Sequence, residues 1–203
     1  MARILLTGFE PFGGEEVNPS AIVAKKAAEE LINHGYDVHM AILPVSFKRA
    51  GTELTSLLNE NRPEIAISLG LYGGASHLRL ERVAVNIKDA SKPDNDGWQP
   101  VDEPIDPIGP AAYFSTLPLR KILEKLKEKG IPATISYSAG TFLCNFTMYT
   151  LLRHADLNGY PKRAGFIHVA YTPDIVARKM NLLASLPLKL QVKAIKLTVE
   201  LSL

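Results

Sequence analysis

Segments patterned as β-strands alternate with segments patterned as α-helices along most of the 203-residue chain. Short apolar runs typical of strands cover residues 4–7, 38–45, 64–69, 131–137 and 164–170. Apolar positions at helical spacing predict helices over residues 19–33, 46–59, 117–129, 142–154, 173–183 and 188–201. This alternation favours an α/β fold, with a mainly parallel sheet and helices on both of its faces.

Two segments depart from the alternation. Residues 78–87 show the partial alternation of short strands, and residues 91–110 are rich in Pro, Asp and Gly. A loop of that length in a compact domain is often functional. The chain contains no internal repeat and no linker, so we expect residues 1–203 to form a single domain.

Charge balance and cysteine content exclude several classes of protein. The net charge is only +2 and 46% of the residues are hydrophobic, which excludes a disordered chain. Cys144 is the only cysteine, so an intrachain disulfide scaffold is excluded and a reducing compartment is favoured. No apolar stretch reaches the ~18 residues of a membrane span, and the apolar start is too short for a signal peptide. We therefore expect a cytoplasmic protein without membrane or nucleic-acid partners.

In parallel sheets, active sites lie beyond the carboxyl ends of the strands. The first such segment, residues 8–14, has two glycines at the spacing of a phosphate-binding loop but lacks its Lys and Ser/Thr. It is either a tight glycine turn with packed aromatic side chains or a pocket wall formed by Phe9 and Phe12. Asn18 precedes Pro19 and is expected to cap the helix that follows.

A second candidate is Cys144, which falls in the first turn of the helix expected over residues 142–154. A helix N-terminus stabilises a thiolate, the reactive form of the side chain, and its N–H groups can hold an oxyanion. The alternative is that Cys144 is a small buried hydrophobic residue.

His168 and Glu81 complete a possible catalytic set. His168 ends an apolar strand and is placed to reach the carboxyl edge of the sheet; the alternative is a core histidine bonded to the backbone. Glu81 lies in an apolar stretch and could fix the tautomer of His168; the alternative is a surface salt bridge with Arg79 or Arg82. The sequence lacks G-x-S-x-G and metal-binding histidine or cysteine motifs, so Cys144, His168 and Glu81 are the candidates for nucleophile, base and orienting residue.

Several blocks of the sequence resemble the pyroglutamyl peptidase I family, also called pyrrolidone carboxyl peptidases. They are TGFEPFGG (7–14) with Asn18-Pro19, LPV (43–45), LERVAVN (80–86), PDN (93–95), SAGTFLCN (138–145) and GFIHV (165–169). The resemblance implies an α/β/α sandwich with a twisted sheet, and a cysteine peptidase that removes an N-terminal pyroglutamyl residue from peptides. It assigns the nucleophile to Cys144, the base to His168 and the third role to Glu81. It implies no cofactor, and a homo-oligomer that is often a tetramer in thermophiles; the missing histidine and cysteine motifs noted above argue against a metal.

The substrate that the resemblance implies is a neutral lactam, which calls for an apolar pocket. We expect Phe9, Phe12, Phe142 and Leu143 to form its walls, Asn18 to fix the adjoining loop, and the N–H of Cys144 to bind the oxyanion. The sequence departs from the family at Ser91-Lys92, where many members have an Arg, at Leu71, where a Gln is common, and at Ala170, where a Pro is frequent.

Two other functions are compatible with the same residues. A cysteine amidase or aminopeptidase of different acyl specificity would need an acidic residue in the pocket to bind a free amine, and Glu10 is the nearest candidate. A non-catalytic α/β protein that binds a small molecule would tolerate alkylation of Cys144.

Overall fold

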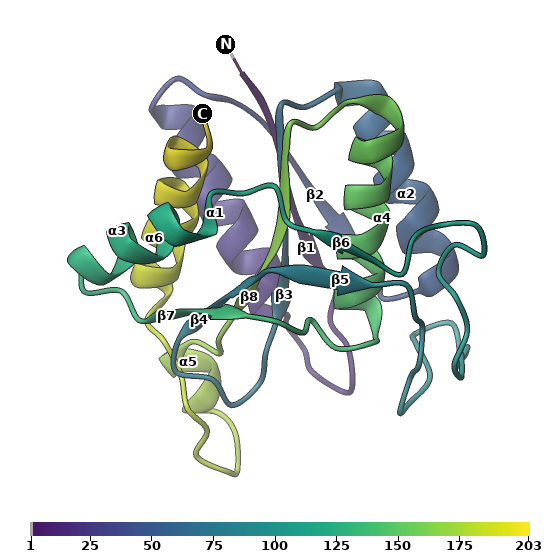
Figure 1. The fold of residues 1–203 in the computed structure, drawn as a ribbon. Helices are drawn as coiled ribbons and strands as arrows, with labels where there is room; N and C mark the ends of the chain where they lie inside the picture. The colour runs from purple at the N-terminus through teal and green to yellow at the C-terminus, as the bar shows by residue number, and fades with distance from the viewer. Residues whose placement is uncertain (1) are drawn as a thin grey trace.

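The computed structural model describes residues 2–203 and consists of a twisted sheet between two layers of helices (Figure 1). The six-stranded sheet has the order β2-β1-β3-β8-β4-β7. Its strands are β1 (Arg3–Phe9), β2 (Asp37–Leu43), β3 (Ile65–Leu71), β4 (Leu78–Glu81), β7 (Ala133–Ser136) and β8 (Arg163–Val169). A separate two-stranded sheet pairs β5 (Val83–Val85) with β6 (Ala112–Phe114).

The helices are divided between the two faces of the large sheet. They are α1 (Pro19–Asn33), α2 (Phe47–Asn61), α3 (Leu119–Glu128), α4 (Leu143–Asn158), the short α5 (Pro173–Val176) and α6 (Leu188–Ser202). Helices α1, α3 and α6 cover one face, and α2 and α4 cover the other (Figure 1). Each layer buries its own apolar cluster against the sheet, which confirms the expected α/β/α arrangement.

The helix starts follow local capping signals. Asn18 accepts a hydrogen bond from Ser20 N–H and caps α1, and Ser46 accepts one from Arg49 N–H and caps α2. Helix α4 begins at Leu143 and continues to Asn158, beyond the expected end at residue 154, because Gly159 provides the left-handed C-terminal residue. None of the helices described in residues 2–203 is both long and apolar enough to cross a membrane.

One helix expected from the sequence is shorter in the structure. The helix expected over residues 173–183 ends at Val176, and residues 177–187 are irregular. Its apolar residues Met180 and Leu182 are fully exposed, so no packing against the sheet supports a longer helix there. The sheet is mainly parallel, as expected; the one antiparallel pairing within it, among the residues described, is that of β4 with β8, and β7 runs parallel to β4.

Candidate active site

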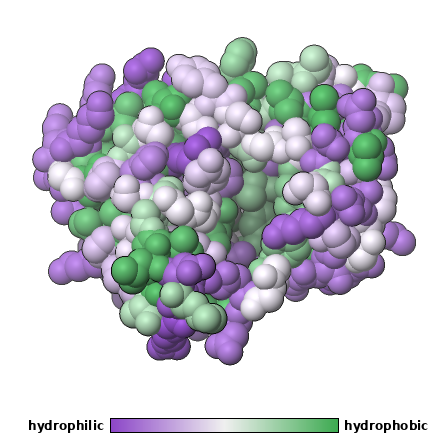
Figure 2. Space-filling model, turned by 90° about the horizontal axis from the view of Figure 1, so that it is seen from below, coloured by the Kyte–Doolittle hydropathy of each residue, from purple (hydrophilic) through white to green (hydrophobic). Residues whose placement is uncertain are grey.

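The three side chains proposed for catalysis lie close together near the edge of the sheet where the parallel strands β1, β3 and β8 end. His168 lies near the end of β8, Glu81 at the end of β4, which runs antiparallel to β8, and Cys144 in the first turn of α4, which follows β7. This face, seen from below the strands, has a central hollow with hydrophobic walls (Figure 2). Of the three, Cys144 lines the cavity, whereas His168 and Glu81 are buried behind it.

The antiparallel pairing of β4 with β8 brings Glu81 to His168. In the register of the two strands, Arg79 lies opposite His168, and Glu81 lies opposite Phe166. His168 and Glu81 are thus diagonal neighbours, and His168 Nδ1 donates to Glu81 Oε1 at 2.8 Å. Both side chains are buried, and Glu81 is completely inaccessible.

The salt bridge that the sequence offered as an alternative for Glu81 also exists, but it is not a surface contact. Arg79 Nε lies 3.3 Å from the same Oε1 atom that accepts the hydrogen bond from His168. Glu81 therefore binds the histidine and one arginine at once, from a fully buried position.

The surroundings of His168 favour its charged form. Burial by itself lowers the pKa of His168, because it disfavours the charged ring. The charge of Cys144 and hydrogen bonds with Cys144 and Glu81 act in the opposite direction and raise the pKa of His168 to about 9. At neutral pH His168 is therefore an imidazolium beside the sulfur of Cys144.

Gly70, at the end of β3, provides the space for the sulfur. A Cβ atom at this position would lie 2.8 Å from Cys144 Sγ and 2.7 Å from Phe166 Cζ. The thiol therefore packs directly against the backbone of a central strand, a close approach that only glycine permits.

The start of α4 is held in place by residues that the sequence analysis did not single out. The buried Asn145 side chain accepts from Val85 N–H at 2.9 Å and donates to Val85 C=O at 2.8 Å and to Ile87 C=O at 3.1 Å. Thr141 Oγ1 donates to Asp89 C=O at 2.7 Å. A polar residue beside Cys144 in an otherwise apolar helix face was the signal that could have identified Asn145.

A cavity of about 350 Å³ opens beside Cys144. All five residues that the sequence predicted for the pocket line it: Phe9, Phe12, Asn18, Phe142 and Leu143. The rings of Phe12 and Phe142 pack with their centroids 5.1 Å apart, and Phe47 supports Phe142 edge-on at 5.3 Å. The pocket wall is therefore apolar and aromatic next to the sulfur.

Asn18 adjoins the pocket, but its polar atoms are engaged with the backbone and with a neighbouring side chain. Its Oδ1 accepts from the N–H and the hydroxyl of Ser20, and its Nδ2 donates to Glu10 C=O at 3.0 Å. Ser20 Oγ in turn accepts from Phe9 N–H at 3.0 Å. Asn18 thus fixes the loop that carries Phe9 and Phe12.

The pocket also contains residues that the sequence analysis did not assign to it. Glu15 and Tyr171 line it, and so do Leu71 and Lys92, two of the positions where the sequence departs from the resembled family. Lys92 Nζ lies 4.3 Å from the centroid of the Phe12 ring. The departures therefore affect the pocket wall itself.

Glu15 is the one carboxylate of the pocket wall among the described residues, and it is paired. Lys179 Nζ donates to Glu15 Oε2 at 2.6 Å, and Tyr171 Oη donates to Oε1 at 3.0 Å. The hydrogen bond from Lys179 is the main cause that lowers the pKa of Glu15. The charge of Glu15 is thus balanced by Lys179.

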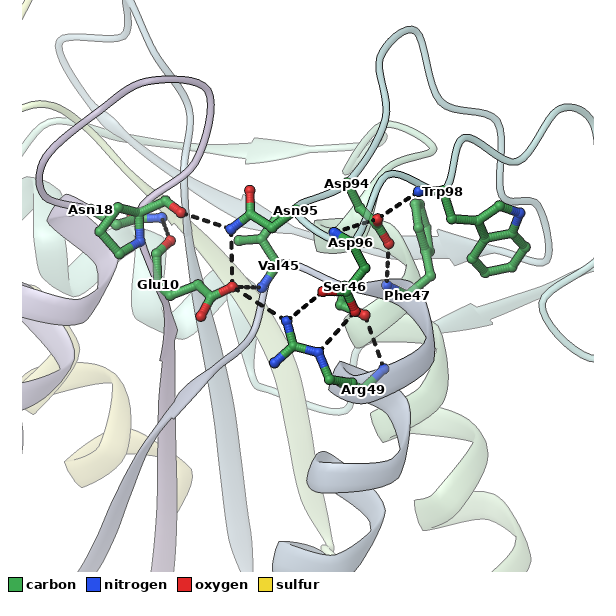
Figure 3. A network of polar contacts seen from close by, with 11 residues as sticks. Glu10, Asn18, Val45, Ser46, Phe47, Arg49, Asp94, Asn95, Asp96 and Trp98 are labelled. Atoms are coloured by element: carbon green, nitrogen blue, oxygen red, sulfur yellow. Dashed lines mark hydrogen bonds and ion pairs between the residues drawn. The ribbon is translucent and has the colours of Figure 1, made fainter.

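Glu10, the acidic residue considered for binding a free amine, lies outside the pocket lining. Figure 3 shows its carboxylate in a polar network, where Oε1 accepts from Val45 N–H at 2.9 Å and from Asn95 Nδ2 at 3.0 Å. In the same network Asp94 accepts from Phe47 N–H at 3.0 Å, at the start of α2 (Figure 3). Glu10 therefore joins the loop after β1 to the long loop that contains Asp94 and Asn95.

Comparison with known proteins agrees with this geometry. The profile of the family described as pyroglutamyl peptidase matches residues 2–203. A pyrrolidone-carboxylate peptidase of Thermococcus litoralis is 51% identical, covering 100% of this chain and 94% of the relative, and one of Pyrococcus furiosus is 46% identical, covering 99% and 98%.

Solved structures give the same result. The Thermococcus litoralis pyrrolidone carboxyl peptidase superposes with a TM-score of 0.92 at 48% identity, covering 100% of this chain and 93% of that one. A mutant pyrrolidone carboxyl peptidase of Pyrococcus furiosus superposes with a TM-score of 0.94 at 45% identity, covering 98% and 97%. The chain therefore belongs to the pyroglutamyl peptidase family.

Proposed function

We propose that this protein is a cysteine peptidase that hydrolyses the amide bond after an N-terminal pyroglutamyl residue. The observation that carries the proposal is the buried Glu81–His168 pair, placed against Cys144 at an apolar cavity. Membership of the pyroglutamyl peptidase family supports the same activity.

In the proposed mechanism, the thiolate of Cys144 attacks the carbonyl carbon that joins the pyroglutamyl ring to the next residue. His168 gives its proton to the leaving amine as the C–N bond breaks, which leaves a thioester on Cys144. His168 then takes a proton from water, the resulting hydroxide attacks the thioester, and the thiolate of Cys144 is released beside the reprotonated His168 as pyroglutamate leaves. Glu81 keeps the ring oriented throughout.

The start of α4 is suited to stabilise the oxyanion of the tetrahedral intermediate. The first N–H groups of a helix have no acceptor within the helix, and Cys144 is the second residue of α4. We assign one oxyanion contact to the N–H of Cys144.

The pocket favours a neutral acyl group. Pyroglutamate is a lactam without a charged nitrogen, and Phe9, Phe12 and Phe142 offer an apolar wall of matching character. A free N-terminal ammonium would lose its hydration without gaining a partner, since Glu15 is already paired with Lys179. Substrates with a free amine are therefore disfavoured.

The test is the release of a fluorogenic amine from its pyroglutamyl conjugate by wild type and by Cys144→Ala, with the alanyl conjugate as control. Turnover of the pyroglutamyl compound alone, lost in Cys144→Ala, supports the proposal. Turnover that survives the substitution refutes the role of Cys144, and turnover of the alanyl compound indicates an aminopeptidase instead. Folded wild type that cleaves neither compound refutes the proposed substrate and leaves an amidase of different acyl specificity or a binding protein.

We further propose that the protein works in the cytoplasm as a homotetramer, without nucleic-acid or membrane partners. The family resemblance supports assembly, and the exposed side chains of Met180 and Leu182 offer apolar surface for it. The single thiol, Cys144, suits a reducing compartment. Light scattering of the purified protein tests the assembly, because a monomer at micromolar concentration contradicts the proposed homotetramer. Cell fractionation tests the proposed location.

A further inference from the structure

Arg79 contacts the proposed catalytic set from a position that neither the resemblance nor the pocket lining assigns. Its Nε atom lies 3.3 Å from Glu81 Oε1, the oxygen that accepts the hydrogen bond from His168. Its side chain is 21% exposed, whereas Glu81 is not exposed at all. The cation therefore lies between solvent and the buried carboxylate.

The guanidinium also reaches the segment that leads to Cys144. Arg79 Nη2 donates to Ser136 Oγ at 2.7 Å and to Ser138 C=O at 3.2 Å. Ser136 ends β7, and Ser138 begins the turn before α4. One side chain thus joins the carboxylate on β4 to the turn that sets the position of the nucleophile.

Tyr72 connects the same guanidinium to the histidine ring. Arg79 Cζ lies 4.0 Å from the centroid of the Tyr72 ring, and the Tyr72 ring packs edge-on against His168, with centroids 5.6 Å apart. Arg79 therefore contacts Glu81 directly, reaches His168 through Tyr72 or Glu81, and reaches Cys144 through the turn that precedes α4.

We propose that Arg79 is a positioning residue that holds Glu81, the turn before Cys144 and Tyr72 in register and partly neutralises the charge that Glu81 presents to His168. The proposal rests on the proposed function for the roles of Cys144, His168 and Glu81.

The positive charge of Arg79 weakens the hold of Glu81 on the proton of His168. The titratable or charged groups that face His168 are Cys144 from α4, Glu81 and Arg79 from β4, and Tyr72 from the segment after β3. Glu81 Oε2 is buried and has no hydrogen-bond partner among residues 2–203, so the charge of this carboxylate is balanced only at Oε1. Without Arg79, the full negative charge would act on the imidazolium, hold its proton more tightly and hinder proton transfer to the leaving amine.

Three variants separate charge from structure. Arg79→Met removes the charge and keeps an apolar side chain of similar length, and Arg79→Lys keeps the charge but loses the planar fork. Arg163→Met is the matched control, because Arg163 is an exposed arginine at the opposite end of β8 from His168. Circular dichroism and thermal melting show that each variant is folded.

Two readouts are measured on the full-length protein. The first is kcat and KM for the pyroglutamyl conjugate. The second is the pH dependence of Cys144 alkylation by iodoacetamide, whose alkaline step follows the loss of the proton from His168. Alkylation requires no substrate turnover, so it tests Arg79 even if wild type fails to cleave the pyroglutamyl conjugate and the proposed function fails.

We expect Arg79→Met to lower kcat by about 10- to 100-fold with KM within about 2-fold of wild type, the size of a partial loss of acid–base catalysis. In Arg79→Met, the alkaline step of Cys144 alkylation should move upward by on the order of one pH unit. This is the shift expected when one positive charge several ångström from His168 is removed at an effective dielectric of ~20. Arg79→Lys should keep the step near the wild-type position, and Arg163→Met should match wild type in both readouts.

Other outcomes overturn the proposal. An alkaline step that stays in place in Arg79→Met shows that the arginine has only a structural role. A step that moves equally in Arg79→Lys shows that charge is not the cause, and equal shifts in Arg163→Met show that any lost arginine has the same effect.

Discussion

Replacing Glu81 by glutamine removes one buried negative charge and keeps the size of the side chain that accepts from His168. The charges of the His168 imidazolium and the Glu81 carboxylate are each spread over several atoms, so we take an effective separation of ~4 Å. At an effective dielectric of ~20, the attraction between the two groups is then ~4 kcal/mol. At ~1.4 kcal/mol per pKa unit, this attraction limits the fall in the pKa of His168 to ~3 units.

Arg79 reduces the size of this effect, because it lies 3.3 Å from the same carboxylate oxygen and offsets part of its charge. We therefore expect the pKa of His168 to fall by about 1 to 2 units in Glu81→Gln. In wild type the imidazolium is lost as the pH rises through about 9, so activity should decline there. In the variant the same decline should begin at lower pH.

The assay is the pH dependence of kcat/KM for the pyroglutamyl conjugate, from about pH 5 to about pH 10 to span both limbs. At the optimum we expect Glu81→Gln to lose on the order of 10²- to 10⁴-fold in kcat, since the histidine is no longer oriented or stabilised as a cation. Glu128→Gln, on an exposed face of α3, is the control. An alkaline limb of Glu81→Gln that coincides with wild type would refute the electrostatic reasoning, as would a shift in the same direction as that of Arg79→Met.

Three further variants test the site at other points. Gly70→Ala places a Cβ atom 2.8 Å from Cys144 Sγ; we expect more than about 100-fold slower alkylation by iodoacetamide, and wild-type reactivity would contradict the packing. Asn145→Ala removes three hydrogen bonds to backbone atoms and should lower the free energy of unfolding by about 2–4 kcal/mol in urea titration; a loss near zero would show that the contacts do not hold α4. Lys179→Met leaves the Glu15 carboxylate without its cation, so KM for the neutral pyroglutamyl conjugate should rise and inhibition by free-amine amides should strengthen. The double variant of Lys179→Met with Glu15→Gln should reverse both effects. Unchanged inhibition in Lys179→Met would exclude Glu15 from specificity.

The sequence by itself determined most of the helices and strands of this protein and the candidate residues near their ends. Asn18 and Ser46 cap helices where the pattern predicted a start, Cys144 follows the apolar run that becomes β7, and His168 lies near the end of the run that becomes β8. These features are local: a cap needs only its own first turn, and an apolar run shows which segment is buried. Phe9, Phe12 and Asn18 adjoin the pocket because they end or follow β1, whereas Phe142 and Leu143 reach it through the start of α4 after β7, a strand that runs opposite to β1.

Only the tertiary structure decided how the candidates meet. Glu81 and His168 are 87 residues apart, and their contact depends on the antiparallel register of β4 against β8, which no local pattern specified. The same register places Arg79 on the buried carboxylate, where the sequence suggested only a surface salt bridge. Packing also decided that the segment after Val176 is not helical and that Lys179 pairs with Glu15. Periodicity records which residues are buried, whereas partners across strands and loops follow from the pairing of segments distant in the chain.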